Sequence, residues 1–250
     1  TSSTTYFVRA IGTCNTTTCA STSVSVNPLP GVSFASPGGP FCASQTTPVS
    51  LSAAPGGGTF SGNGVVGSTF TPANAAVGNN TLTYTYTDGN GCTNTAQQIV
   101  LITGLPSVSF TGLAGPYCVS QTTPVLLDGN QNGGTYSGPG ITNLGSGNAN
   151  FNPSTALAGV HSITYSYTDG NGCVSSQTQS VQVIALPTVQ ISGLAAAYCV
   201  SNAPVQLTGF PAGGTFSGTG VTSGGLFSPS TGTGNYTITY TYTNGNGCTN

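Results

Sequence analysis

The feature that most constrains this chain is internal repetition of one short motif. The motif reads "TYTYTDGNGCTN" at 83–94, "TYSYTDGNGCVS" at 164–175 and "TYTYTNGNGCTN" at 239–250. Self-similarity over several tens of residues is the signature of a tandem array, in which each copy is one structural unit. We therefore take the sequence as successive repeats and look for the motifs that the copies share.

Each repeat carries its motifs in a fixed order. A first cysteine (Cys42, Cys118 or Cys199) precedes a short apolar run, and then come "GGTFSG" at 57–62, "GGTYSG" at 133–138 and "GGTFSG" at 213–218. A Phe-x-Pro follows each of these, and the repeated turn comes after it. Short runs between turn signals at this spacing predict an antiparallel β-sandwich. Two segments, "TPANAAVG" and "PSTALAG", have room for at most one helical turn.

The strand before the repeated turn alternates in a period of two. Leu82, Tyr84 and Tyr86 are separated by threonines, so we expect the apolar side chains in the core and the threonines in water. The DGNG stretch supplies residues that tolerate a tight hairpin turn. D-x-N-G also resembles the start of an EF-hand loop, but one carboxylate per repeat is too few ligands for calcium. Asn244 replaces that aspartate in the third copy, so we predict a structural turn and no metal.

Leu-Pro segments mark the predicted domain boundaries. They are "NPLP" (27–30), "TGLP" (103–106) and "IALP" (184–187). We expect complete Ig-like domains at 31–106 and 107–187, and a domain at 188–250 that lacks its last strand. Residues 1–30 resemble the last two strands of a preceding domain. Two explanations remain open: the chain is an excerpt of a longer tandem array, or a neighbouring chain's strand completes each open sheet.

Eight cysteines, none in a C-x-x-C pair, predict disulfides and an oxidising extracellular setting. Position within each repeat predicts the intradomain pairs Cys42–Cys92, Cys118–Cys173 and Cys199–Cys248. Each would close a loop of about 50 residues and contribute roughly 4 kcal/mol in the chain-entropy model. Cys14 and Cys19 would staple the tip of a hairpin, or either would bond a partner outside the chain.

The composition argues against functions that require several charged side chains, such as catalysis and nucleic-acid binding. Charged residues make up 2% of the chain, and its titratable side chains other than Tyr and Cys are Arg9, His161, Asp88, Asp128 and Asp169. An active site needs several such groups in one pocket, so we expect no enzyme and no cofactor. A single arginine cannot bind nucleic acid, and no apolar run is long enough for a membrane helix.

The single residues of this set have structural interpretations. His161 matches Asn80 and Tyr236 in the other copies, which indicates an exposed strand start and not a catalytic base. Alternation in "TYFVRAIG" places Tyr6 and Val8 inward and Arg9 in solvent, and Asp128 falls in a predicted turn. The remaining surface is rich in Thr, Ser, Asn, Gln and Gly. A surface with so little charge repulsion suits a fibre, a bundle or a glycosylated stalk.

These motifs together resemble a known group of proteins. The run "PYCVSQTTPVLLDGNQNGGTYSGPGI" with "FNPSTALAGVHSITYSYTDGNGC" is similar to the Ig-like or PKD-like repeats of very large secreted surface proteins of Bacteroidota. The resemblance covers nearly the whole chain. It implies export by the type IX system, a place on the cell surface, and a part in gliding-motility adhesins or stalks. It carries over no catalytic residue.

The sequence thus predicts an all-β tandem array of disulfide-stapled Ig-like sandwiches that forms the shaft of an extracellular filament or adhesin. Its expected partners are neighbouring domains of the same long chain, other copies in a fibre, and polysaccharide or solid surfaces. One alternative is a polysaccharide- or surface-binding module that uses exposed loops and Tyr/Thr faces. The other is a filament subunit that polymerises by strand donation.

Overall fold

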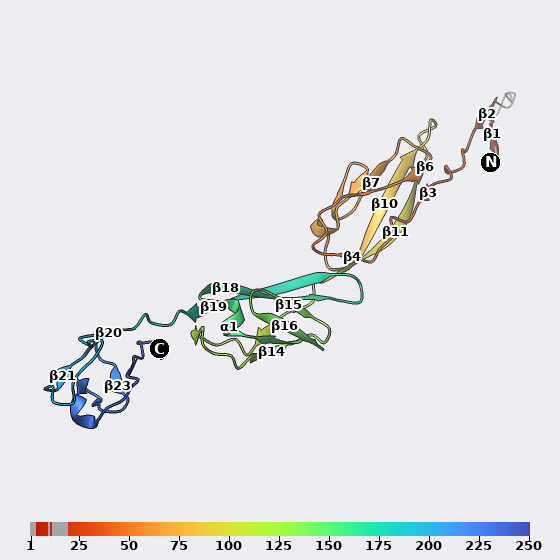
Figure 1. Cartoon of the computed structure of the whole chain (residues 1–250). Helices are drawn as coiled ribbons and strands as arrows, with labels where there is room; N and C mark the ends of the chain where they lie inside the picture. Colours follow the sequence, from red (N-terminus) through yellow and green to blue (C-terminus); the bar gives the residue numbers. More distant parts are fainter. Residues whose placement is uncertain (1–3, 10, 12–19) are drawn as a thin grey trace. The chain divides into compact units, whose positions relative to one another are not determined.

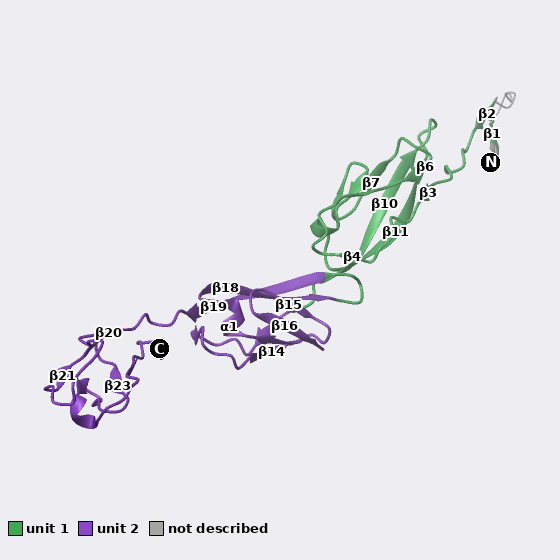
Figure 2. Ribbon diagram, viewed as in Figure 1, with its two compact units in different colours: residues 1–106, 169–173 green, residues 107–168, 174–250 purple. Residues whose placement is uncertain are grey.

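The computed structural model describes residues 4–9, 11 and 20–250, and nearly all of its regular structure is β-strand (Figure 1). The chain divides into two compact units, shown in Figure 2: unit 1 contains 1–106 with 169–173, and unit 2 contains 107–168 with 174–250. The segments 72–74 and 153–156 each form about one helical turn, as predicted, and 229–231 forms a further one that was not predicted. Within the described ranges, no helix is long and apolar enough to span a bilayer.

Unit 1 holds a two-layered sandwich. One layer has the strand order β4-β11-β10-β7. The other layer is made of the pair β3-β6 and the three-stranded group β5-β9-β8. Their bounds are β3 (Ser33–Phe34), β4 (Phe41–Cys42), β5 (Val49–Ser50), β6 (Ala53–Ala54), β7 (Thr59–Ser61), β8 (Val65–Val66), β9 (Thr69–Phe70), β10 (Gly78–Thr87) and β11 (Thr93–Thr103). A separate pair, β1 (Thr4–Val8) and β2 (Ala20–Val24), precedes them.

Unit 2 begins with the same arrangement. Its layers have the orders β13-β19-β18-β15 and β12-β14-β17-β16. Their bounds are β12 (Phe110–Thr111), β13 (Tyr117–Cys118), β14 (Val125–Gly129), β15 (Thr135–Ser137), β16 (Ile141–Gly145), β17 (Asn148–Phe151), β18 (Gly159–Thr168) and β19 (Val174–Ile184), with α1 (Pro153–Ala156) before β18.

The third repeat has shorter strands, which occur only as pairs. They are β20 (Gln190–Ser192) with β22 (Thr208–Phe210), β21 (Val205–Gln206) with β24 (Leu226–Phe227), and β23 (Thr215–Ser217) with β25 (Thr239–Thr241). These layers confirm the predicted all-β sandwich fold class.

Two strand pairs depart from the predicted antiparallel pattern. β4 runs parallel to β11, and β13 runs parallel to β19. The chain crosses from the layer of β3 to the layer of β11 between Phe34 and Phe41 without first forming a hairpin. β4 therefore runs in the same direction as β11. This parallel pairing decides which cysteines can meet.

A tyrosine on the long strand anchors each core. Tyr84 and Tyr165 are 2% and 0% exposed, and Tyr240 is 6% exposed. Each ring packs on the aromatic residue of the GGT-F/Y-SG motif, with centroids 4.6 Å apart for Phe60–Tyr84 and 4.5 Å apart for Tyr136–Tyr165. The hydroxyl of each tyrosine then donates to a backbone carbonyl: that of Pro55, Gln131 or Pro211. The alternation predicted for these strands is confirmed.

The same contact explains the second glycine of the GGT motif. A Cβ on Gly134 would lie 2.2 Å from Oη of Tyr165, and one on Gly58 would lie 2.6 Å from Cζ of Tyr84. Both distances are far below a van der Waals contact. The tyrosine ring therefore takes the space of a side chain, and only glycine fits beneath it.

Three predicted placements are wrong in detail. Tyr6 and Val8 are 61% and 72% exposed, because β1 and β2 form a two-stranded pair with no second layer over them. Asp128 lies in β14, where it pairs with Asn148. His161 is half-buried and its Nε2 lies 2.9 Å from the Leu157 carbonyl oxygen. Arg9 is exposed, as predicted.

Candidate functional site: the cysteine links and an open groove

The repeated turn is a hairpin held by one side-chain oxygen. Oδ1 of Asp169 accepts hydrogen bonds from the backbone N–H groups of Asn171 and Cys173, each at 2.9 Å. Asp88 makes the same two bonds in the first repeat, and Asn244 makes them in the third at 3.0 Å. An amide replaces a carboxylate without changing the contacts, so the turn uses the oxygen as an acceptor and has no need of its charge. The hairpin interpretation is confirmed.

The predicted cysteine pairing is wrong. Cys42 is bonded to Cys173 and Cys118 is bonded to Cys248, with Cα–Cα distances of 5.5 Å. Each disulfide lies within one compact unit. Each nevertheless joins the first cysteine of one sequence repeat to the turn cysteine of the next repeat, and not to the turn cysteine of its own.

Strand length is the physical reason for this difference. Cys42 pairs with Thr103 at the end of β11, whereas Cys92 immediately precedes the start of that strand. A strand rises about 3.3 Å per residue, so the two cysteines of the first repeat are separated by roughly 35 Å. A disulfide requires Cα atoms within about 7 Å. Within one repeat, the first cysteine and the turn cysteine lie at opposite ends of the sandwich.

Local contacts surround the bonded turn cysteines. The hydroxyl of Thr103 donates to the Phe41 carbonyl oxygen at 3.1 Å and lies 3.0 Å from Sγ of Cys173. Cys173 and Cys248 are each 1% exposed, whereas their partners Cys42 and Cys118 are half-buried. A reducing thiolate, which must reach a sulfur atom to exchange with it, can therefore approach each disulfide from the side of its first cysteine.

Two of the described cysteines carry no disulfide. Cys92 is a turn cysteine and is half-buried, and Cys199 is a first cysteine and is exposed. Cys92 keeps the turn geometry of Cys173 and Cys248, because its N–H donates to Asp88. Cys14 and Cys19 lie outside the described residues, so their pairing stays a prediction.

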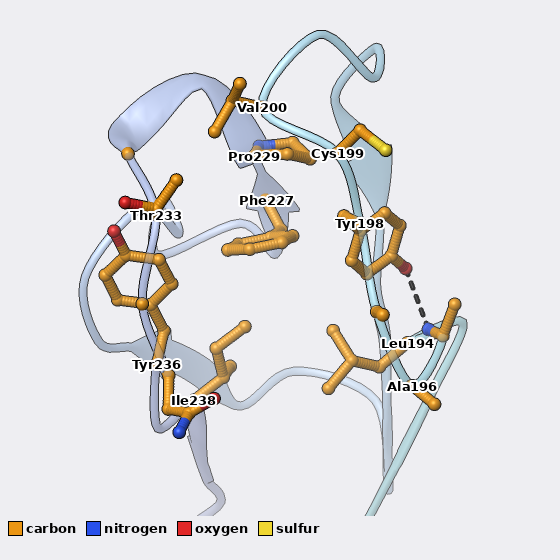
Figure 3. Close-up of a pocket in the computed structure, with 15 residues that line it drawn as sticks. Leu194, Ala196, Tyr198, Cys199, Val200, Phe227, Pro229, Thr233, Tyr236 and Ile238 are labelled. Carbon is orange, nitrogen blue, oxygen red and sulfur yellow. Dashed lines mark hydrogen bonds between the residues drawn. The ribbon is translucent and has the colours of Figure 1, made fainter.

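An open groove lies beside Cys199 in the third repeat (Figure 3). It encloses about 540 Å³. Leu194, Tyr198 and Val200 line it from the segment 194–200, and Phe227, Tyr236 and Ile238 line it from the segment 227–238. The Tyr198 hydroxyl accepts a hydrogen bond from the Ala195 N–H at 2.8 Å, which holds the first of these segments in place.

The second repeat shows what fills the equivalent space. There the last strand, β19, brings Val181 and Val183 into the core at 4% and 2% exposure, and Leu113 and Val119 pack on that core. Their counterparts in the third repeat, Leu194 and Val200, are 49% and 47% exposed. The groove thus lies where β19 packs in the second repeat. Sequence analysis did not predict this groove.

The described residues offer little acid–base or metal chemistry. They contain no group of three or more His, Cys, Asp or Glu side chains that could hold a metal ion. Burial raises the pKa of Tyr136 well above its ordinary value, with added repulsion from Tyr165 and Asp128. Burial also raises the pKa of Tyr165, with added repulsion from Asp128 and Tyr167. Both tyrosines are core residues.

Comparison with known proteins identifies one family match. Residues 11–101 match the family described as bacterial Ig domain. The search of curated proteins by sequence returned no match. The match covers part of the first predicted domain together with the segment before it, so it identifies a bacterial Ig domain in this part of the chain.

Several solved structures of extracellular proteins are weakly similar. A Ca²⁺-stabilised adhesin with which an Antarctic bacterium binds ice is 14% identical, over 99% of this chain and 79% of that one, with a TM-score of 0.37. Drosophila N-cadherin EC1-4 is 12% identical, over 96% and 78%, with a TM-score of 0.30. Protocadherin γB7 EC3-6 is 15% identical, over 76% and 62%, with a TM-score of 0.28.

Proposed function

We propose that this chain is a structural segment of an extracellular bacterial surface filament or adhesin, in which Ig-like repeats act as a tension-bearing shaft. The observation that carries the proposal is the connectivity of the two disulfides. Each spans about half of the chain, and the loop closed by Cys42–Cys173 overlaps the loop closed by Cys118–Cys248.

Overlapping loops limit how far the chain can be extended. With both disulfides intact, the shortest covalent path from Thr1 to Asn250 runs through 1–42, 118–173 and 248–250. The remaining residues are bypassed even if every strand unfolds. Such an arrangement suits a chain that is pulled at its ends, and disulfides persist in the oxidising medium outside the cell.

The surface and the strands support the same role. The outward side chains of β11 are polar near its start, with Thr93, Thr95 and Gln97 exposed, and the chain has a net charge of −2. Little charge repulsion separates such chains, which favours lateral packing into a fibre. We further propose adhesion to polysaccharide or solid surfaces, with gliding motility as its use, in a Bacteroidota-type surface protein.

Immunogold electron microscopy of intact cells tests this proposal. Antibodies raised against the folded chain should label filaments on the outside of unpermeabilised cells, at intervals along their length. Cells that lack the gene serve as the control. Labelling that appears only after permeabilisation, or only as isolated points with no filament, would contradict the proposed role.

A further inference from the structure

The two disulfides differ in the residue that lies beside the first cysteine. In the strand pair β4–β11, the cross-strand partner of Cys42 is Thr103, the last residue of β11. In the pair β13–β19, the partner of Cys118 is Ile184, the last residue of β19. Threonine places a hydroxyl group at this point, and isoleucine has none. Two otherwise equivalent bonds therefore have different chemical surroundings.

The Thr103 hydroxyl lies against the sulfur atom of the turn cysteine. Its Oγ1 is 3.0 Å from Sγ of Cys173, in a part-buried contact. A sulfur atom in a disulfide has no proton to donate, so the hydroxyl is the only donor in this contact. In the oxidised chain the hydroxyl donates to the Phe41 carbonyl oxygen, 3.1 Å away. A thiolate at Cys173 is a stronger acceptor, and the hydroxyl proton can rotate toward it.

The exposure of the two sulfur atoms decides which one a reductant attacks. Cys42 is half-buried, whereas Cys173 is 1% exposed. An incoming thiolate therefore reaches Sγ of Cys42, and Cys173 is the leaving group. Exchange is faster when the leaving thiolate is more stable, and a hydrogen bond to a charged atom stabilises it. Thr103 thus lies beside the atom on which the leaving charge develops.

We propose that Cys42–Cys173 is a redox-sensitive joint between the first and second repeats, and that the Thr103 hydroxyl makes a monothiol such as reduced glutathione cleave it before Cys118–Cys248. Cys42 belongs to the first repeat and Cys173 to the second. The turn 169–173 is part of unit 1, and this bond ties it there. Once the bond is cleaved, only the peptide chain through Pro106 links the two repeats covalently.

The reduction consists of two exchange steps. A glutathione thiolate attacks Sγ of Cys42, the sulfur–sulfur bond breaks, and Cys173 leaves as a thiolate that accepts a hydrogen bond from Thr103. A second glutathione thiolate attacks the glutathione sulfur of the mixed disulfide and releases the Cys42 thiolate. Two cysteines gain two electrons, and two glutathione molecules lose them as one oxidised glutathione. The two protein thiolates take up the two protons that the glutathione thiols lost.

Asp169 opposes this effect. Its carboxylate accepts a hydrogen bond from the Cys173 N–H at 2.9 Å, and its negative charge disfavours a thiolate in the same turn. Asn244 has no charge at the equivalent place beside Cys248. Asp169 is half-buried, so solvent screens its charge, whereas the Thr103 contact is direct. A direct hydrogen bond to a charged atom is stronger than a screened charge interaction, so the hydroxyl decides the order of reduction.

Timed reduction of the oxidised chain tests the inference. Thiols outside the two disulfides are first blocked with iodoacetamide, so that they cannot exchange. The chain is then incubated with excess reduced glutathione, and samples are quenched with N-ethylmaleimide, digested with pepsin and analysed by mass spectrometry. We expect maleimide or glutathione adducts on Cys42 and Cys173 before they appear on Cys118 and Cys248. Equal rates, or the reverse order, would overturn the proposal.

Two variants at Thr103 separate its hydroxyl from its shape. Thr103→Val keeps the shape and should slow cleavage of Cys42–Cys173 by roughly threefold to tenfold, because the leaving thiolate loses its donor. Thr103→Ser keeps a hydroxyl and should restore most of the wild-type rate. Cys118–Cys248 in the same molecule is the internal control, and its rate should not change. A valine variant as fast as wild type, or a serine variant as slow as valine, would contradict the role of Thr103.

A reciprocal variant places the hydroxyl at the other disulfide. Ile184→Thr should speed cleavage of Cys118–Cys248 by a similar factor, since Ile184 is the cross-strand partner of Cys118. Ile184→Val has the shape of threonine without its hydroxyl and is the matched control, which should react at the wild-type rate. Equal rates for the threonine and valine variants would overturn the proposal, because loosened packing would then account for any change.

The charge of the turn is tested on its own. Asp169→Asn makes the turn of the second repeat equal in charge to that of the third and keeps the acceptor oxygen. It should speed cleavage of Cys42–Cys173 further, because the leaving thiolate no longer meets a carboxylate. In this background the two disulfides differ at Thr103 and Ile184, so a faster Cys42–Cys173 supports the hydroxyl. Equal rates in this background would contradict it.

This redox-sensitive joint is independent of the surface role proposed above. A chain whose two disulfides are reduced at equal rates could still bear tension in a filament, and an easily reduced joint could occur in a protein with another role. Failure of the reduction experiment and failure of the surface labelling are therefore distinguishable.

Discussion

At the scale of single residues, the second repeat departs from its neighbours at one core position. Tyr136 stands where the other repeats have Phe60 and Phe216, and its buried hydroxyl has no hydrogen-bond partner. A buried polar group without a partner has lost its hydration and gained nothing in return. The neighbouring Tyr165 hydroxyl, by contrast, donates to the Gln131 carbonyl. Two tyrosines in contact therefore have opposite effects on stability.

Tyr136→Phe should raise the free energy of unfolding of unit 2 by about 1 kcal/mol, because it removes an unsatisfied hydroxyl and keeps the ring. The matched control, Tyr165→Phe, should lower that free energy by about 1 kcal/mol, since it leaves a carbonyl without its donor. Urea unfolding followed by circular dichroism measures both changes. A destabilising Tyr136→Phe change would show that the hydroxyl has a partner.

A second prediction concerns the glycine under the tyrosine ring. Gly134→Ala should destabilise unit 2 by about 3 kcal/mol or more, because the added methyl group overlaps Tyr165 and the core must shift. Gly133→Ala is an instructive comparison, since Gly133 has a positive φ of 96° and no atom near its Cβ position. Its cost of about 1–2 kcal/mol would come from backbone strain alone. Equal costs at the two positions would contradict the contact with Tyr165.

At the scale of elements, the turn between the two long strands recurs in every repeat. One side-chain oxygen at its first position accepts hydrogen bonds from two backbone N–H groups, and one of these belongs to the turn cysteine, so the bonds fix the backbone conformation at that cysteine. The third repeat performs the same function with Asn244. The charge of the aspartate is therefore dispensable, while its acceptor oxygen is required.

Asp169→Asn should leave stability within about 0.5 kcal/mol of wild type, and Asp169→Ala should lower it by about 1–2 kcal/mol, because two N–H donors lose their acceptor. Thermal unfolding at pH 7 compares the two variants. Addition of calcium gives a further check, because a metal loop would raise the melting temperature of the wild type and lose the effect in the Asn variant. We expect no such rise.

At the scale of the whole molecule, the disulfides determine how far the chain extends under force. With a maximum of about 3.6 Å per residue, the oxidised chain should extend to roughly 35 nm between its ends, and the reduced chain to roughly 90 nm. Single-molecule pulling with and without a reductant measures both lengths. Equal contour lengths in the two conditions would contradict the connectivity of Cys42–Cys173 and Cys118–Cys248.

Much of this molecule is determined by local sequence. Alternation in "TLTYTYT" places Leu82 and Tyr84 in the core, and DGNG forms the predicted hairpin, because both depend on neighbours within a few residues. The strand class, the brief helical turns and the repeat order follow in the same way.

The disulfide pairing, the groove and the exposure of β1 depend on which elements meet in space, and no local pattern contains that information. Their positions in the repeat predict that Cys42 and Cys92 are bonded, but the eleven-residue strand β11 separates them in space. Cys42 bonds Cys173 because β4 runs parallel to β11 and brings it to the end of that strand. Alternation predicted Tyr6 and Val8 inward, yet a side chain is buried only when a second layer covers it. The sequence by itself determined the strands and turns, and the tertiary structure decided which of their ends come together.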